Sequence, residues 1–207
     1  MRAEIEDPAM SHETSSQHPG ARVVVLSGNP RAGSRTTAAA VRIGEETARL
    51  LGSEQPVETV ELAGFAAEIL ADAHPTADEA LRTVADATVL VVATPVYKAS
   101  YTGLLKAFLD LYGPGGLSGV AAVPVVVSGN PAHALVGEVH LRPLLVELGA
   151  VVPTRALTLV ESQLTDPDPV IERWWSEGGH ALGAQVAAAA TAVLGGAVAP
   201  QLAEARA

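Results

Sequence analysis

Short apolar runs alternate along the chain with segments of helical periodicity. Runs such as RVVVLS and ATVLVVATP are rich in β-branched residues, which is typical of strands buried on both faces of a parallel sheet. Between them, apolar residues recur every three or four positions, the spacing of an amphipathic helix. This alternation predicts an α/β domain with a parallel sheet, right-handed crossovers and helices on both faces.

Five strands and five helices are expected. The strands are predicted at 22–27, 57–62, 87–95, 120–129 and 152–160. The helices are predicted at 36–52, 77–87, 101–112, 134–149 and 170–195. Thr76 is expected to cap the N-terminus of the second helix, and Pro143 to break or kink the fourth. Pro124 is unusual in the middle of a strand, because it cannot donate to the ladder.

Composition narrows the function classes. The 207 residues predict one domain at 21–195, with a disordered tail at 1–20 and a mobile tail at 196–207. A net charge of −10 argues against a nucleic-acid surface and against an anionic membrane as partner. The absence of Cys excludes disulfides and Cys-based metal centres. The first 20 residues lack the apolar core of a secretion signal, so a cytoplasmic location is expected.

Candidate chemistry is expected where the strands end, because ligands of open α/β sheets bind outside the carboxyl ends of the strands. The loop SGNPRAGSRT joins a buried strand to a helix, and free N–H groups at Ala32 to Thr36 would attract an anion. Arg31 and Arg35 add two guanidinium groups, which suits a phosphate monoester. The alternative is an ordinary polar turn with a Ser or Thr cap.

Two further loops lie at the same edge. In TPVYKASYTG, Val96 and Tyr97 are placed to lie against a flat heteroaromatic ring, with backbone N–H groups donating to it and Lys98 serving an anion. The alternative is a strand-ending Pro, an exposed Tyr and a solvated Lys. In SGNPAHAL, Gly129 permits close approach of a ligand, whereas His133 either touches ligand or faces water.

No other constellation competes with these loops. The histidines lack zinc-ligand spacing, so no metal site is predicted, and no G-x-S-x-G motif marks a hydrolase. Trp174 and Trp175 on the last helix are expected in the core or in an interface.

Three segments together resemble the NADPH-dependent FMN reductase family, and most closely the reductase components of two-component alkanesulfonate monooxygenases. They are LSGNPRAGSRTT (26–37), VVATPVYKASYTGLLKAFLDL (91–111) and SGNPAHAL (128–135), and the resemblance spans roughly residues 22–160. It implies a flavodoxin-like fold with strand order 2-1-3-4-5, and FMN with NADPH or NADH as cofactors.

The resemblance also implies a set of binding residues. The FMN phosphate would be held by Asn29, Arg31, Ser34, Arg35 and Thr36, and the isoalloxazine lined by Pro95, Val96, Tyr97 and Lys98, with Gly129 and His133 near its other side. Asn29 departs from the family, which often carries Ser there, although an amide still donates. Tyr101 matches a Tyr at a subunit interface near the flavin, which implies a homodimer or homotetramer.

The implied reaction is hydride transfer from nicotinamide C4 to flavin N5. The protein then supplies position and polarity, so no catalytic side chain is expected. Reduced FMN would be released to a partner monooxygenase. One alternative is an enzyme that keeps FMN bound and reduces quinones, azo dyes or metal ions. A non-enzymatic alternative is an electron carrier of the flavodoxin type.

Overall fold

A five-stranded parallel sheet forms the centre of the protein. The computed structural model describes residues 18–196, with side chains to residue 191. The strands are β1 (Val23–Ser27), β2 (Glu58–Glu61), β3 (Val89–Pro95), β4 (Ala121–Ser128) and β5 (Leu157–Val160). Their order is β2-β1-β3-β4-β5, and every pairing is parallel, which confirms the predicted architecture. Most of the two predicted tails lies outside the described residues.

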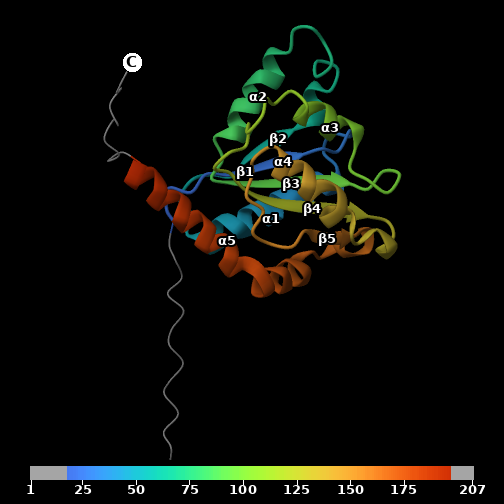
Figure 1. The fold of residues 1–207 in the computed structure, drawn as a ribbon. Helices are drawn as coiled ribbons and strands as arrows, with labels where there is room; N and C mark the ends of the chain where they lie inside the picture. The colour runs from blue at the N-terminus through green and yellow to red at the C-terminus, as the bar shows by residue number, and fades with distance from the viewer. Residues whose placement is uncertain (1–17, 197–207) are drawn as a thin grey trace, which may run out of the picture.

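Helices cover both faces of the sheet (Figure 1). The first face carries α1 (Arg35–Leu51) and α5 (Asp168–Gly196), and the second carries α2 (Pro75–Ala85), α3 (Gly103–Leu109) and α4 (Arg142–Glu147). Short 3₁₀-helices add η1 (Leu62–Phe65), η2 (Pro131–His133) and η4 (Glu161–Thr165), and a π-helical turn forms η3 (Gly137–Leu141). None of the described helices has the length and apolar character needed to cross a membrane.

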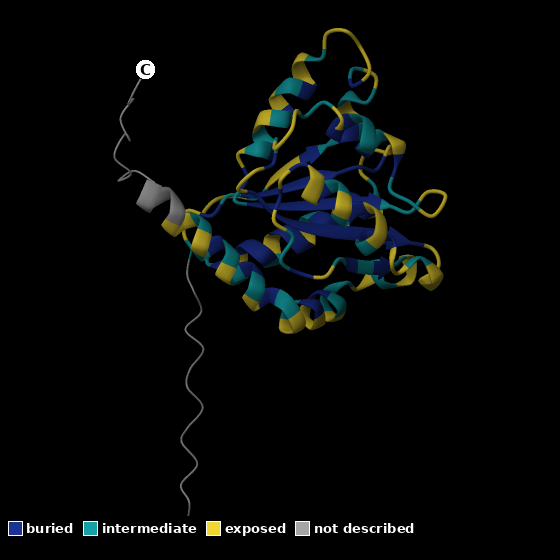
Figure 2. Ribbon diagram, in the orientation of Figure 1, coloured by how far each residue is buried: buried dark blue, intermediate teal, exposed yellow. Residues whose placement is uncertain are grey.

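The alternation of side chains along each strand divides the core in two. Val23 and Val25 of β1 pack toward α1 and α5, whereas Val24 and Leu26 pack toward the other face. Every residue of β1 and β4 is buried, and the strands appear dark blue in Figure 2. This explains why their sequences are continuous apolar runs, while the edge strand β2 exposes Glu58 and Thr59.

Trp174 belongs to the core on the α1 and α5 side, as one of the predicted alternatives had it. It is 8% exposed, and its Nε1 donates to the carbonyl of Arg155 at 2.7 Å. Trp175 is partly buried against the same cluster.

The second helix starts earlier than predicted. Pro75 is its first residue, and His74 occupies the N-cap position without a side-chain cap bond, so the assignment of Thr76 as the cap is wrong. Proline suits the first turn because its fixed φ is already helical and its missing N–H has no partner there. The carboxylate of Glu68 instead accepts the N–H of Ala77 at 2.9 Å.

The two prolines that the sequence places inside predicted elements, Pro124 and Pro143, lie where a missing N–H is tolerated. Ala122 donates to the carbonyl of Val151 on the β5 side at 2.8 Å, and by alternation the N of Pro124 faces the same side. Pairing of β4 with β5 begins only at Val125, so Pro124 interrupts no bond of that ladder. The predicted break near Pro143 is confirmed, since η3 precedes α4 and Pro143 lies in the first turn of α4.

Candidate functional site

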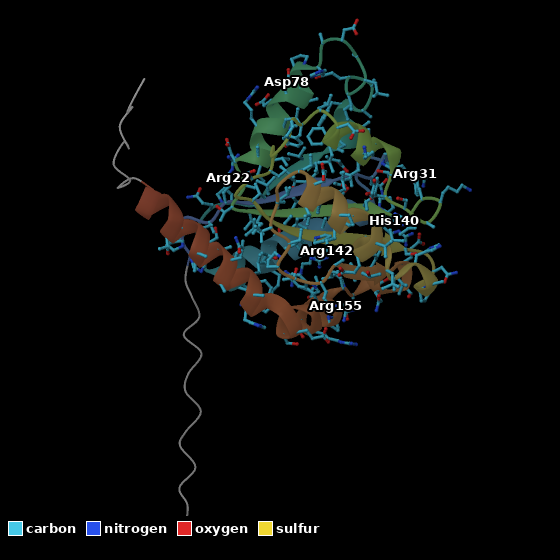
Figure 3. All side chains as sticks on the ribbon, viewed as in Figure 1. Arg22, Arg31, Asp78, His140, Arg142 and Arg155 are labelled. Carbon is cyan, nitrogen blue, oxygen red and sulfur yellow. The ribbon has the colours of Figure 1, made fainter. Side chains whose placement is uncertain are left out.

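A cavity of about 460 Å³ opens at the carboxyl ends of the strands. It lies between the loop after β1, the loop after β3, the end of β4 and the 3₁₀-helix that follows β5. Of the predicted site residues, the cavity is lined by Asn29, Arg31, Ser34, Arg35, Thr36, Pro95, Val96, Tyr97 and Gly129. Figure 3 shows Arg31 at this end of the molecule and Arg22, which precedes β1, at the opposite end.

Polar side chains of the loop after β1 shape the loop itself. Asn29 is buried; its Oδ1 accepts the N–H of Arg31 at 3.0 Å, and its Nδ2 donates to Thr36 Oγ1 at 3.1 Å. Ser34 caps α1 by accepting the N–H of Thr37 at 3.1 Å. Gly33 has a φ of 61°, a left-handed conformation that favours glycine.

Backbone N–H groups at the start of α1 remain available. Within the described part of the chain, the N–H groups of Ala32, Ser34, Arg35 and Thr36 donate to no protein acceptor. They stand at the N-terminus of a 17-residue helix that has no acidic residue in its first turn. Free N–H groups and the positive end of a helix dipole together attract an anion. The predicted set of free donors therefore forms, except at Gly33.

Two carboxylates that the sequence reasoning missed reach this loop. Glu61 Oε1 accepts the N–H of Gly33 at 2.9 Å and lies 2.9 Å from Thr37 Oγ1. Glu161 Oε2 lies 3.0 Å from Arg35 Nη2, and Glu161 lines the cavity. Glu61 ends β2 and Glu161 follows β5, so a search of all five strand ends would have found both.

The loop after β3 turns sharply outward. Tyr97 and Ser100 exchange two backbone hydrogen bonds, of 2.9 and 3.1 Å, around Lys98 and Ala99, which have positive φ angles of 51° and 60°. Left-handed backbone conformations are costly for residues other than glycine, and they cluster at functional sites. Val96 donates its N–H to the carbonyl of Val127, so Val96 and Tyr97 offer faces to the cavity rather than the free N–H donors expected from the sequence.

Thr102 ties this loop to the first one. Its Oγ1 donates to the carbonyl of Gly28 at 2.6 Å and accepts the N–H of Leu105 at 3.1 Å. A Cβ on Gly28 would lie 2.7 Å from the Cβ of Leu105, so only glycine permits this approach. The loop after β1 and the loop after β3 are thus held at one fixed separation.

Three residues of the predicted set lie outside the cavity lining. Lys98 is exposed at the tip of its turn, and His133 has its Nδ1 3.2 Å from Ser128 Oγ. Tyr101 packs partly buried against the core on the α3 side. Among the described residues, no cluster of His, Asp or Glu has the arrangement to hold a metal ion.

The sequence profile described as "NADPH-dependent FMN reductase" matches residues 21–164. The chain belongs to this family. The FMN reductase (NADPH) of Escherichia coli (strain K12) is 34% identical over 148 residues, covering 70% of this chain and 76% of the relative. The NADH-dependent FMN reductase SfnF of Pseudomonas putida is 36% identical over 128 residues, covering 59% of this chain and 68% of the relative.

Solved structures agree with membership of the FMN reductase family. The apo form of an NADH:FMN oxidoreductase, EmoB, has a TM-score of 0.65 and 30% identity, covering 83% of this chain and 89% of its own. An oxidoreductase from Corynebacterium diphtheriae has a TM-score of 0.67 and 28% identity, covering 82% and 97%. The predicted family, fold, enzyme class and cofactors are therefore confirmed.

Proposed function

We propose that this FMN reductase family member oxidises NADPH or NADH, reduces FMN in the cavity at the strand ends, and releases the reduced FMN to a partner monooxygenase. The observation that carries the proposal is the set of free N–H groups of Ala32, Ser34, Arg35 and Thr36 beside Arg31. These donors suit a phosphate monoester, and the cavity volume lies in the range of small-molecule sites.

Each wall of the cavity has a part in this proposal. The N-terminus of α1 would hold the phosphate. Pro95, Val96 and Tyr97 would carry the isoalloxazine on one side, and the bare backbone of Gly129 would leave room for it on the other. FMN, when bound, supplies an acceptor at N5 for the hydride of the nicotinamide. The protein's contribution is orientation, because hydride transfer needs no side-chain acid or base.

Some parts of the sequence hypothesis go beyond this cavity. Four features stay predictions. They are the contacts of Lys98 and His133 with ligand, a subunit interface at Tyr101, the homodimer or homotetramer, and the cytoplasmic location. A partner monooxygenase of the alkanesulfonate type is likewise proposed on the sequence resemblance. One of the relatives is named for NADPH and another for NADH. The nucleotide preference of this protein is therefore measured with both.

Steady-state kinetics test the proposal. Oxidation of NADPH and of NADH is followed at saturating nucleotide while free FMN is varied. We expect a hyperbolic dependence on FMN and protein that is purified largely without flavin. Tightly bound yellow flavin with turnover of quinones or azo dyes would favour the alternative enzyme. Bound FMN that neither nucleotide bleaches under anaerobic conditions would favour an electron carrier.

A further inference from the structure

The charges at the proposed phosphate loop are balanced by the protein itself. Arg31 and Arg35 are exposed residues that line the cavity, and the carboxylates of Glu61 and Glu161 contact the same loop. Phosphate sites generally offer a net positive charge to their ligand. Here an incoming phosphate meets the carboxylate of Glu161, which lines the cavity and already pairs with an arginine that would bind the phosphate, while the carboxylate of Glu61 contacts the same loop.

The two carboxylates differ in what they hold. Glu61 accepts the N–H of Gly33 and contacts the hydroxyl of Thr37, so it fixes the loop. Glu161 lies on η4 and reaches across the cavity to Arg35, 126 residues away in sequence. Both side chains of that pair are more than half exposed. Exposed pairs of this kind are weak, so Arg35 can exchange its partner without unfolding anything.

We propose that Glu161 determines how readily the flavin leaves: it competes with the phosphate of FMN for Arg35 and repels that phosphate when it is bound. This inference rests on the proposed function. A phosphate monoester carries between one and two negative charges at neutral pH, so it displaces the single charge of a carboxylate from Arg35. Glu161 has then lost its partner Arg35. Since Glu161 still lines the cavity, its carboxylate repels the bound phosphate.

The consequence is an affinity set below what the donors alone would provide. When FMN leaves, Glu161 pairs with Arg35 again, and the two opposite charges cancel. Such an exchange lowers the free-energy difference between the bound and free states. It suits an enzyme that must hand its flavin to another protein, because tight binding of the product would slow each cycle.

Glu161→Gln tests this directly. Dissociation constants for FMN and for riboflavin, which lacks the phosphate, are measured by flavin fluorescence with wild type and variant. We expect FMN to bind roughly threefold to tenfold more tightly and riboflavin to change less than about twofold, since only the phosphate competes for Arg35. The KM for FMN should fall in the same proportion. Glu161→Ala should behave in the same direction.

Glu177→Gln is the matched control. Glu177 forms a similarly exposed pair with Arg173, at 2.9 Å on α5, and neither residue lines the cavity. It should leave both flavin affinities unchanged. In an Arg35→Ala background, Glu161→Gln should tighten FMN by less than in the wild type, because the competition is gone and only repulsion remains.

Two results would overturn the inference. If Glu161→Gln leaves FMN binding unchanged or weakens it, Glu161 does not oppose the phosphate. If FMN and riboflavin change equally, Glu161 acts on the ribityl or ring part, or on the shape of the cavity. Failure of the proposed function looks different, because then the wild type itself would bind neither flavin and would not oxidise NADPH or NADH with FMN.

Discussion

Individual residues of the loop after β1 divide into those that build it and those that remain free to bind. Asn29 and Ser34 form side-chain hydrogen bonds within the loop and at the first turn of α1. Gly33 supplies a left-handed backbone conformation in the same loop. The N–H groups at the start of α1 are left unsatisfied at the cavity. A loop that is already ordered loses little entropy when the ligand binds, which raises affinity without additional contacts.

Arg31 and Arg35 should distinguish FMN from riboflavin. Charged hydrogen bonds contribute about 1.5–3 kcal/mol each, so the double variant Arg31→Ala with Arg35→Ala should weaken FMN binding by about 100-fold or more. Riboflavin should bind as it does to the wild type. Fluorescence titration with both flavins measures this, and Arg173→Ala, an exposed arginine on α5, is the control. Equal losses for the two flavins would contradict a phosphate site at α1.

Gly129 should separate flavin binding from folding. A Cβ at Gly129 would meet nothing closer than Glu161 Oε1 at 3.9 Å, and its φ is not in the left-handed region. Gly129→Val should therefore fold with nearly unchanged stability while its side chain fills the cavity. We expect at least a tenfold loss of affinity for FMN and riboflavin alike, since both carry the same rings.

The control for this change is Gly113→Val. Gly113 follows α3 outside the cavity lining, and a Cβ there would meet nothing within 4 Å. Thermal unfolding and flavin titration of the two variants are compared. Normal flavin binding by Gly129→Val would show that the rings lie elsewhere.

At the scale of elements, the ion pair between Arg142 and Glu138 holds the segment that precedes the last strand. The apolar pattern predicts a strand over 152–160, but β5 forms only from Leu157. Arg142, near the start of α4, donates to the carbonyls of Val152 and Thr154, and Glu138 accepts the N–H of Ala156 at 2.6 Å. Arg142 and Glu138 therefore hold residues 152–156 against η3 and α4, and this segment stays outside the ladder with β4.

Glu138 should make this arrangement sensitive to acid. Burial raises the pKa of Glu138, but hydrogen bonds from Arg142 and from the N–H of Ala156 outweigh burial, so the net shift is downward. A folded-state pKa below the unfolded value of about 4.3 gives stability that is complete above that value. This stability is lost as the pH falls through the folded-state pKa.

Urea unfolding of wild type and Glu138→Gln at several pH values measures this contribution. At pH 7 the variant should be less stable by about 1–3 kcal/mol, because a charged hydrogen bond to Arg142 is lost. The difference should shrink as the pH falls from 5 toward 3, since the wild-type carboxylate becomes neutral. A stability difference that stays constant across this range would mean that the charge of Glu138 is irrelevant.

In the whole molecule, segments that lie far apart in the sequence form one cavity. Parallel strands all end at the same edge, and the order β2-β1-β3-β4-β5 brings the loops after β1, β3 and β4 together there. Thr102 and Gly28 connect two of these loops, so their positions relative to each other are fixed by the fold. Ligand binding is then coupled to the stability of the entire fold rather than to one segment.

Saturation with FMN should therefore stabilise the protein globally. At a concentration of about 100 times the dissociation constant, binding to the folded state alone adds about 2.7 kcal/mol to the free energy of unfolding. For a domain of this size that corresponds to a rise in Tm of roughly 5–10 °C. Calorimetry with and without FMN measures the shift. Gly129→Val, which should bind FMN at least tenfold more weakly, should show at most about half of this shift at the same FMN concentration. An equal shift in that variant would argue for binding at another place.

The sequence alone was sufficient for the elements, the sheet and the region of the site. Continuous apolar runs mark strands buried on both faces, and helical spacing marks the elements between them, because burial leaves its period in the local sequence. Parallel strands then place the loops after β1, β3 and β4 at one edge. The motifs in those loops pointed to the family that the comparisons confirmed.

Only the tertiary structure decided which side chains meet. Glu61 and Glu161 reach the α1 loop from β2 and η4, and no local pattern records a contact between residues so far apart in the chain. The turn at Lys98 and the contact between His133 Nδ1 and Ser128 Oγ likewise go with side chains that lie outside the cavity lining. Periodicity encodes whether a residue is buried, whereas its neighbours depend on strand order and on the exact path of each loop.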